Sequence, residues 1–257
     1  MTHLRMLVPV LVLALTMGAA VGRCAERRVL DLGGGVTLEL AVVPAGSFQM
    51  GSPTTEEGRR DFEGPVHTVT IVRPFALGVT EVTHAQWHAV MGGSMRCLEE
   101  SEQPIANVTW NEAREYCERL SAMQGAVVHL PSEAQWEYAC RAGSTGPRYG
   151  ELDDVAWYEA NSGGASMAVA TKRANAWGFH DMLGNVWEFC EDAWQPSYEG
   201  APTDGSAVTG TGNRVFRGGA WDYPPDGCRA ASRRHAAADF HSDRIGFRVM
   251  MDLEGEE

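Results

Sequence analysis

Residues Asn175–Trp194 read NAWGFHDMLGNVWEFCEDAW, and this stretch is the strongest pointer to the fold. It combines large aromatic rings with glycines and carboxylates, and it follows neither a helix period nor a strand period. Rings of this size fill a core, and glycine supplies backbone angles that other residues resist. We therefore predict a tightly folded loop segment here. Carboxylates held on such a loop are hard oxygen ligands, the kind that calcium prefers.

The composition around this stretch is that of a folded acidic protein. The chain has 257 residues, 44% of them hydrophobic, which is enough for one sizeable domain or two small ones. The formal net charge of -13 and the pI of about 5.0 argue against charge-driven binding to nucleic acid or to anionic membranes. The high counts of Trp and Gly favour a loop-rich fold built on aromatic packing.

The N-terminus has the pattern of a secretory signal peptide over residues 1–22. His3 and Arg5 precede an apolar run from Met6 to Thr16, and small residues follow. An alternative is a lipoprotein anchor at Cys24, but Arg23 does not suit that motif. The run is short for a membrane span, and no later segment is long and apolar enough to cross a membrane. We therefore expect an exported protein, periplasmic or extracellular.

Short strands and capped helices are predicted along the rest of the chain, and we expect a single α+β domain over residues 36–252. Alternating or apolar runs predict strands at Val36–Val43, Phe48–Ser52, Val66–Val72, Phe75–Val79 and Ile245–Met251. Three residues are expected to cap helices at their N-termini, namely Thr83, Asn111 and Ser132.

Several short motifs occur in an order that resembles the sulfatase-modifying-factor family, the formylglycine-generating-enzyme-like domain. Besides the central stretch, they are FQMGS at Phe48–Ser52, PVHTV at Pro65–Val69, EVT at Glu81–Thr83, PIANVTW at Pro104–Trp110, LPSEAQWEYA at Leu130–Ala139, RGGAW at Arg217–Trp221 and IGFR at Ile245–Arg248. The resemblance implies an irregular, loop-rich α+β fold related to C-type lectins.

The family's enzymes oxidise a cysteine of a client sulfatase with copper(I) held by two cysteines near the C-terminus. Copper(I) prefers soft thiolates. In the matching segment, Gly218–Arg234, an ungapped count from the glycine pair places Tyr223 and Cys228 at these positions. A count back from Ile245–Arg248 places no cysteine at either. We therefore expect the copper site to be absent, with Cys228 as the only thiol candidate for catalysis.

The cysteines are also candidates for disulfides, because an exported chain meets an oxidising compartment. The six cysteines are Cys24, Cys97, Cys117, Cys140, Cys190 and Cys228. The resemblance implies a disulfide between Cys228 and Cys140, with Cys190 as the alternative partner.

Calcium is the cofactor that the resemblance implies, as a structural ion. The ligands would be the side chains of Asp181 and Glu188 and the backbone carbonyls of Gly184 and Val186. The alternative is that both carboxylates only bond loop backbone. A second family site begins near Asn161 but lacks the acidic loop that completes it.

Histidines offer weaker metal hypotheses. His235, Asp239 and His241 offer the ligand set of a non-haem iron site, but the resemblance argues against iron here because iron in the family usually lies in a separate domain. His84 and His88 lie four residues apart on a helix, but no third ligand accompanies them, so we interpret them as a solvent-facing pair.

Two functions follow from these patterns. The first is a binding or accessory module without formylglycine-generating activity, whose protein or peptide partner would contact the cleft around Trp187, Trp221, Cys228 and Arg233. The second is an oxidoreductase with a divergent metal site, built on Cys228 with another cysteine or on the His235, Asp239 and His241 set.

Overall fold

The largest sheet is built around β2 (Thr37–Val43), whose alternating residues are buried. In the computed structural model, which describes residues 26–93 and 101–253, this sheet has five strands in the order β1-β2-β5-β13-β6. All its pairs are antiparallel. The other members are β1 (Arg27–Asp31), β5 (Phe75–Gly78), β6 (Val128–His129) and β13 (Met250–Asp252). The strands predicted at 36–43 and 75–79 are thus confirmed to within a residue.

The second sheet has four strands in the order β11-β10-β9-β12, and its longest strand lies inside the central stretch. Apart from Glu191, every residue of β9 (Trp187–Ala193) is buried. The prediction of a loop was therefore wrong for this half, because a strand buried on both faces shows no alternation. The remaining strands are β10 (Arg214–Arg217), β11 (Arg233–Ala236) and β12 (Ile245–Gly246), which runs parallel to β9.

The segment predicted as one closing strand is divided between the two sheets. Ile245 and Gly246 pair with β9, whereas Met250 and its neighbours pair with β5 and β6. The single-strand prediction was wrong because the chain leaves strand structure at residues 247–249. Arg248 is buried there and pairs with Glu188.

Three α-helices begin at side-chain caps. Thr83 and Ser132 cap α1 (His84–Met91) and α3 (Glu133–Arg141), as predicted, each in a reciprocal capping box with a Gln. The cap of α2 (Trp110–Gln124) is Thr109 rather than the predicted Asn111, because Glu112 completes the box from that position. A helical turn, α4 (Leu152–Val155), precedes the short parallel pair of β7 (Ala156–Trp157) and β8 (Leu183–Gly184).

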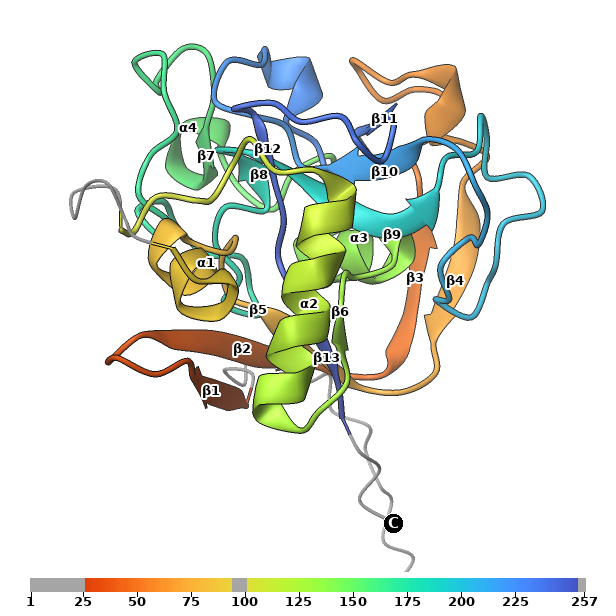
Figure 1. Ribbon diagram of the computed structural model, residues 1–257. Helices are drawn as coiled ribbons and strands as arrows, with labels where there is room; N and C mark the ends of the chain where they lie inside the picture. Colours follow the sequence, from red (N-terminus) through yellow and green to blue (C-terminus); the bar gives the residue numbers. More distant parts are fainter. Residues whose placement is uncertain (1–25, 94–100, 254–257) are drawn as a thin grey trace, which may run out of the picture.

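Figure 1 shows how these elements surround α3 and β9, which lie behind α2. A hairpin of β3 (Gly46–Met50) and β4 (His67–Ile71) lies at one side of the view, and β1 and β2 lie at the bottom. The expectation of a loop-rich α+β domain is confirmed. Within the residues that the model describes, no helix is long and apolar enough to cross a membrane. The expected signal peptide, Cys24 and Cys97 lie outside these residues.

Candidate functional site

Buried charge is concentrated on α3 and the strands beside it. We define the arginine-rich cluster as Glu133, Glu137, Arg141, Arg217 and Arg233, all of them buried. Glu137 pairs with both Arg141 and Arg217, and Glu133 pairs with Arg233 at 2.7 Å. Burial alone would raise the pKa of Glu137, but the two guanidinium groups hold it below its ordinary value. Glu137 therefore stays ionised, and both carboxylates of the cluster are paired with arginines.

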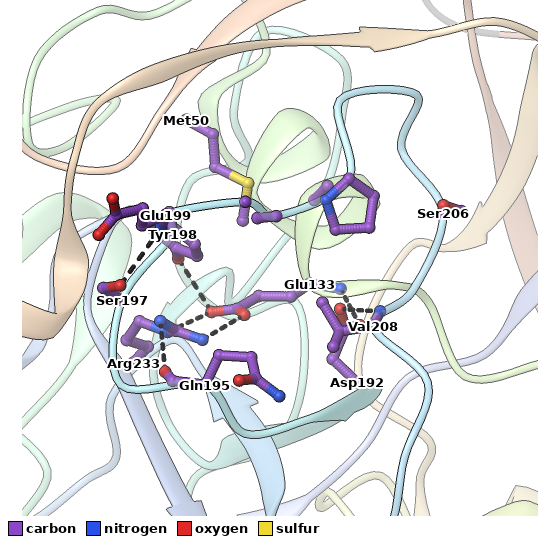
Figure 2. Close-up of a pocket in the computed structure, with 14 residues that line it drawn as sticks. Met50, Glu133, Asp192, Gln195, Ser197, Tyr198, Glu199, Ser206, Val208 and Arg233 are labelled. Atoms are coloured by element: carbon purple, nitrogen blue, oxygen red, sulfur yellow. Dashed lines mark hydrogen bonds and ion pairs between the residues drawn. The ribbon is translucent and has the colours of Figure 1, made fainter.

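A cavity of about 140 Å³ opens beside this cluster (Figure 2). Glu133 and Arg233 lie on one wall, and the hydroxyl of Tyr198 donates to Glu133 at 3.0 Å. Arg233 also donates to the backbone carbonyls of Phe62 and Gln195. Its guanidinium group is thus committed to structural contacts, and it lines this cavity rather than the cleft in which we expected it.

Asp192 lines the same cavity and accepts hydrogen bonds from the backbone N–H groups of Glu133 and Val208 (Figure 2). Burial, with the nearby charge of Glu133, raises the pKa of Asp192 to about 7. This carboxylate therefore joins the start of α3 to the loop that holds Val208.

A second group of buried charges lies on the other side of Trp136. We define the acid-rich cluster as Glu81, Asp181, Glu188 and Arg248, all of them buried. Glu188 accepts two hydrogen bonds from Arg248, at 2.6 and 2.7 Å, and a third at 2.7 Å from the indole of Trp136. Both oxygens of this expected calcium ligand are therefore occupied by protein donors.

Asp181, the other expected side-chain ligand, has a free oxygen. It adopts a φ of 56°, and its Oδ2 accepts the backbone N–H of Ala170 at 2.7 Å. Its Oδ1 is buried without a hydrogen-bond partner among the described residues. Burial raises the pKa of Asp181 to about 6. Gly184 and Val186, which were expected to contribute carbonyls, are buried a few residues further along the same chain.

Glu81 is a member of this cluster that the sequence analysis did not single out. Its side chain is completely buried, and neither carboxylate oxygen has a partner within the described part of the chain. Burial raises its pKa well above the ordinary value, and the charges of Asp181 and Glu188 add to this effect. The EVT motif that contains Glu81 was visible in the sequence, but its spacing gave no sign of this environment.

The disulfide predictions are not met in the structure. Cys117, Cys140, Cys190 and Cys228 are all buried free thiols. The Cys140 thiol lies 3.8 Å from the carbonyl of Met182, and Cys228 lies under the glycine pair, where a Cβ on Gly219 would come within 2.7 Å of its sulfur. Burial raises the pKa of Cys228 to about 12, which disfavours the reactive thiolate.

The expected cleft residues are separated. Trp187 is almost completely buried, and its ring packs edge-on against Tyr223 at 5.0 Å. Trp221 is partly exposed, and the guanidinium of Arg244, which pairs with Asp222 at 2.5 Å, lies over its ring. Trp221 is therefore the member of the expected set that remains available to a partner.

The histidine sets are not assembled into metal sites. His235 stacks on Trp194 at 4.2 Å and bonds Asn213, whereas His241 bonds Asn107. Among residues 26–93 and 101–253, no three His, Cys, Asp or Glu side chains are grouped so that they could hold a metal ion. The described geometry therefore gives the alternative hypothesis of an iron site at His235, Asp239 and His241 no support. His84 and His88 likewise gain no third ligand.

Sequence and structure comparisons find relatives of this chain in one family. The model of the sulfatase-modifying factor enzyme 1-like domain matches residues 36–253. The inactive C-alpha-formylglycine-generating enzyme 2 of Bos taurus is 29% identical over 86% of this chain and 90% of its own length. The formylglycine-generating enzyme of Streptomyces coelicolor is 30% identical over 82% of this chain and 88% of its own length. The structure of PvdO from Pseudomonas aeruginosa superposes with a TM-score of 0.82 at 34% identity, covering 88% of this chain and 98% of PvdO.

Proposed function

Because the chain belongs to the sulfatase-modifying factor enzyme 1-like family, we propose that it is an exported accessory or binding protein without cysteine-oxidising activity. The observation that carries this proposal is the environment of Cys228. It is the only cysteine in the segment Gly218–Arg234, and its side chain is completely buried. A copper(I) site of the family type needs two thiolates, and the other candidate position is occupied by Tyr223.

The thiol chemistry of the segment supports the same conclusion. A nucleophilic or metal-binding cysteine is normally accessible and has a lowered pKa. Cys228 has a raised pKa and lies beneath backbone atoms of the glycine pair. The Bos taurus relative, whose name calls it inactive, matches nearly the whole domain. A member of this family that keeps the fold without the oxidase reaction therefore has a precedent among its relatives.

Partner binding is proposed for the surface around Trp221. Trp221 follows the glycine pair by two residues, and the ion pair of Asp222 with Arg244 lies beside it. The resemblance matches this surface to the substrate cleft of the family's enzymes. Trp and Arg are the residue types that dominate binding energy in protein interfaces. We infer a protein or peptide partner for this surface.

Calcium is proposed as a structural ion beside Asp181. The free Oδ1 of Asp181 is buried, so a hard cation would satisfy it. Glu188 does not fit as a ligand while Arg248 occupies both its oxygens. The ion would therefore rely on Asp181 and on the backbone carbonyls of Gly184 and Val186.

The test of the proposed function is an oxidation assay with a defined positive control. The purified protein and the Streptomyces coelicolor enzyme are each loaded with copper(I) and incubated with dioxygen and a cysteine-containing sulfatase peptide. We expect formylglycine from the control alone, detected by mass spectrometry, and no stoichiometric copper on this chain. Formylglycine formation that disappears in a Cys228→Ser variant would overturn the proposal.

A further inference from the structure

A second and larger cleft, of about 580 Å³, lies between the β3–β4 hairpin and the C-terminal end of α3. Phe48 and Gln49 line it from β3, Thr68 from β4, and Tyr138 and Arg141 from α3. Trp177 completes the lining. Clefts of a few hundred Å³ with a largely apolar lining are the usual binding places of small ligands. None of these residues belongs to the acid-rich cluster or to the Trp221 surface.

The walls of this cleft are aromatic and held in place. Tyr138 lies between Phe48, at 5.2 Å between ring centroids, and Trp177, at 4.9 Å and nearly perpendicular. Asn175 fixes the Trp177 loop, because its amide donates to the carbonyls of Ala139 and Cys140 while its oxygen accepts the backbone N–H of Trp177. Phe48 and Trp177 are both partly exposed, so their faces are available without rearrangement.

The cleft offers no free charge to a ligand. Among the described residues that line the cleft, Arg141 is the one ionisable group that is charged at neutral pH, and its side chain is only 6% exposed and paired with Glu137. It bonds Glu137 and the carbonyls of Gly146 and Gly51, at 2.8 to 3.0 Å. A charged ligand would therefore lose its hydration without gaining an ion pair.

Neutral polar groups surround the aromatic walls. The amide of Gln49 donates to Thr68 at 2.8 Å, which leaves its exposed oxygen as an acceptor. Burial raises the pKa of Tyr138, so its hydroxyl remains a donor at neutral pH. Ser47, Ser144 and Thr145 add further hydroxyl groups to the lining.

We propose that this cleft binds an uncharged sugar ring, one hexopyranose unit of a glycan. The C–H faces of such a ring stack on aromatic side chains, and its hydroxyls match the amide and hydroxyl groups of the rim. Gln49, Ser47 and Ser144 already make hydrogen bonds within the protein but keep acceptor lone pairs that a purely apolar ligand would not use, and an ionic ligand would find no unpaired counter-charge. This site is independent of the accessory function proposed above, because it shares no residue with the surface around Trp221.

Titration calorimetry with maltohexaose, cellohexaose and chitohexaose tests the proposal on the purified full-length protein. We expect at least one of these neutral oligosaccharides to bind. Trp177→Ala should weaken that binding at least tenfold by removing one stacking face. Thr145→Trp should do the same by filling the cleft from an exposed position, so this variant keeps the test decisive if Trp177→Ala does not fold.

The matched control is Phe240→Ala, which removes an aromatic ring that is 47% exposed and lies outside the cleft. It should bind the sugar as the wild type does. The proposal is overturned if none of the three oligosaccharides binds at about 10 mM, or if both cleft variants bind normally. Binding of a proline-rich decapeptide in the cleft, without any sugar binding, would also overturn it.

Discussion

The arginine-rich and acid-rich clusters both bury charged side chains, but they differ in the balance of positive and negative groups. Both clusters contact Trp136. Arg217 lies over the Trp136 ring, and the indole N–H donates to Glu188. In the arginine-rich cluster, three guanidinium groups face two carboxylates, and each carboxylate is paired. In the acid-rich cluster, three carboxylates share one guanidinium group, and Glu81 and Asp181 keep oxygens without partners among the described residues.

This difference separates a cluster that stabilises the fold from one that can bind a proton or a cation. Both carboxylates of the arginine-rich cluster are paired with guanidinium groups, and these pairs hold α3 against β10 and β11. A cluster with excess negative charge must be compensated by a proton or a cation. We therefore expect structural damage from changes in the first cluster and sensitivity to calcium and pH in the second.

The largest effect is expected from Arg217→Met. This change leaves Glu137 without one of its two cations and removes donors from the carbonyls of Ala230, Ala231 and Ser232. Breaking a buried pair from one side costs about 3–5 kcal/mol of unfolding free energy. Urea unfolding followed by tryptophan fluorescence measures this loss.

The matched control for Arg217→Met is Arg28→Met, at an exposed arginine whose nearest acid, Glu26, lies 3.7 Å away. Surface pairs of this kind contribute about 0–1 kcal/mol. If both variants lost the same small amount of stability, the arginine-rich cluster would not be the scaffold that its contacts indicate.

A smaller effect is expected from calcium. If the ion binds at Asp181, calcium at about one hundred times its dissociation constant stabilises the fold by about 2.7 kcal/mol. For a domain of this size, this shift corresponds to a rise of roughly 5–11 °C in Tm. Differential scanning calorimetry with calcium, with magnesium and with EDTA measures it.

Asp181→Ala should abolish the calcium effect, whereas Asp154→Ala, at a carboxylate that is 57% exposed, should retain it. Equal stability of the wild type in calcium and in EDTA would rule out the ion at this position. The excess charge of the acid-rich cluster would then have to be compensated by protons alone.

The sequence predicted structure that depends on local interactions, but it did not predict contacts between residues far apart in the chain. Alternating and apolar runs predicted β2 and β5 of the first sheet, and the capping boxes at Thr83 and Ser132 each lie within four residues. The pairs that define the two clusters join residues 60 and 80 positions apart, and no sequence period encodes them. Ordered motifs identified the family, yet they gave no sign that Arg248 neutralises Glu188 or that Glu81 is unpaired.

The smallest change in unfolding free energy is expected from Glu81→Gln, measured across pH in EDTA. This variant tests the acid-rich cluster directly. The pKa of Glu81 in the folded protein is raised above its ordinary value of 4.5. The native state therefore binds more protons than the unfolded chain above that pH, and wild-type stability falls as pH rises through this range. Gln keeps the shape without the charge, so the variant should lose less stability over the same range.

At pH 4.5 the two proteins should be about equally stable, and at pH 8 the Glu81→Gln variant should be the more stable by on the order of 1 kcal/mol. Glu39→Gln is the control, because Glu39 is 50% exposed and should leave the pH profile unchanged. A variant that is less stable than the wild type at pH 8 would mean that the ionised carboxylate of Glu81 has a stabilising partner in solution. Because EDTA excludes calcium, that result would contradict a cluster whose excess negative charge is compensated by protons alone.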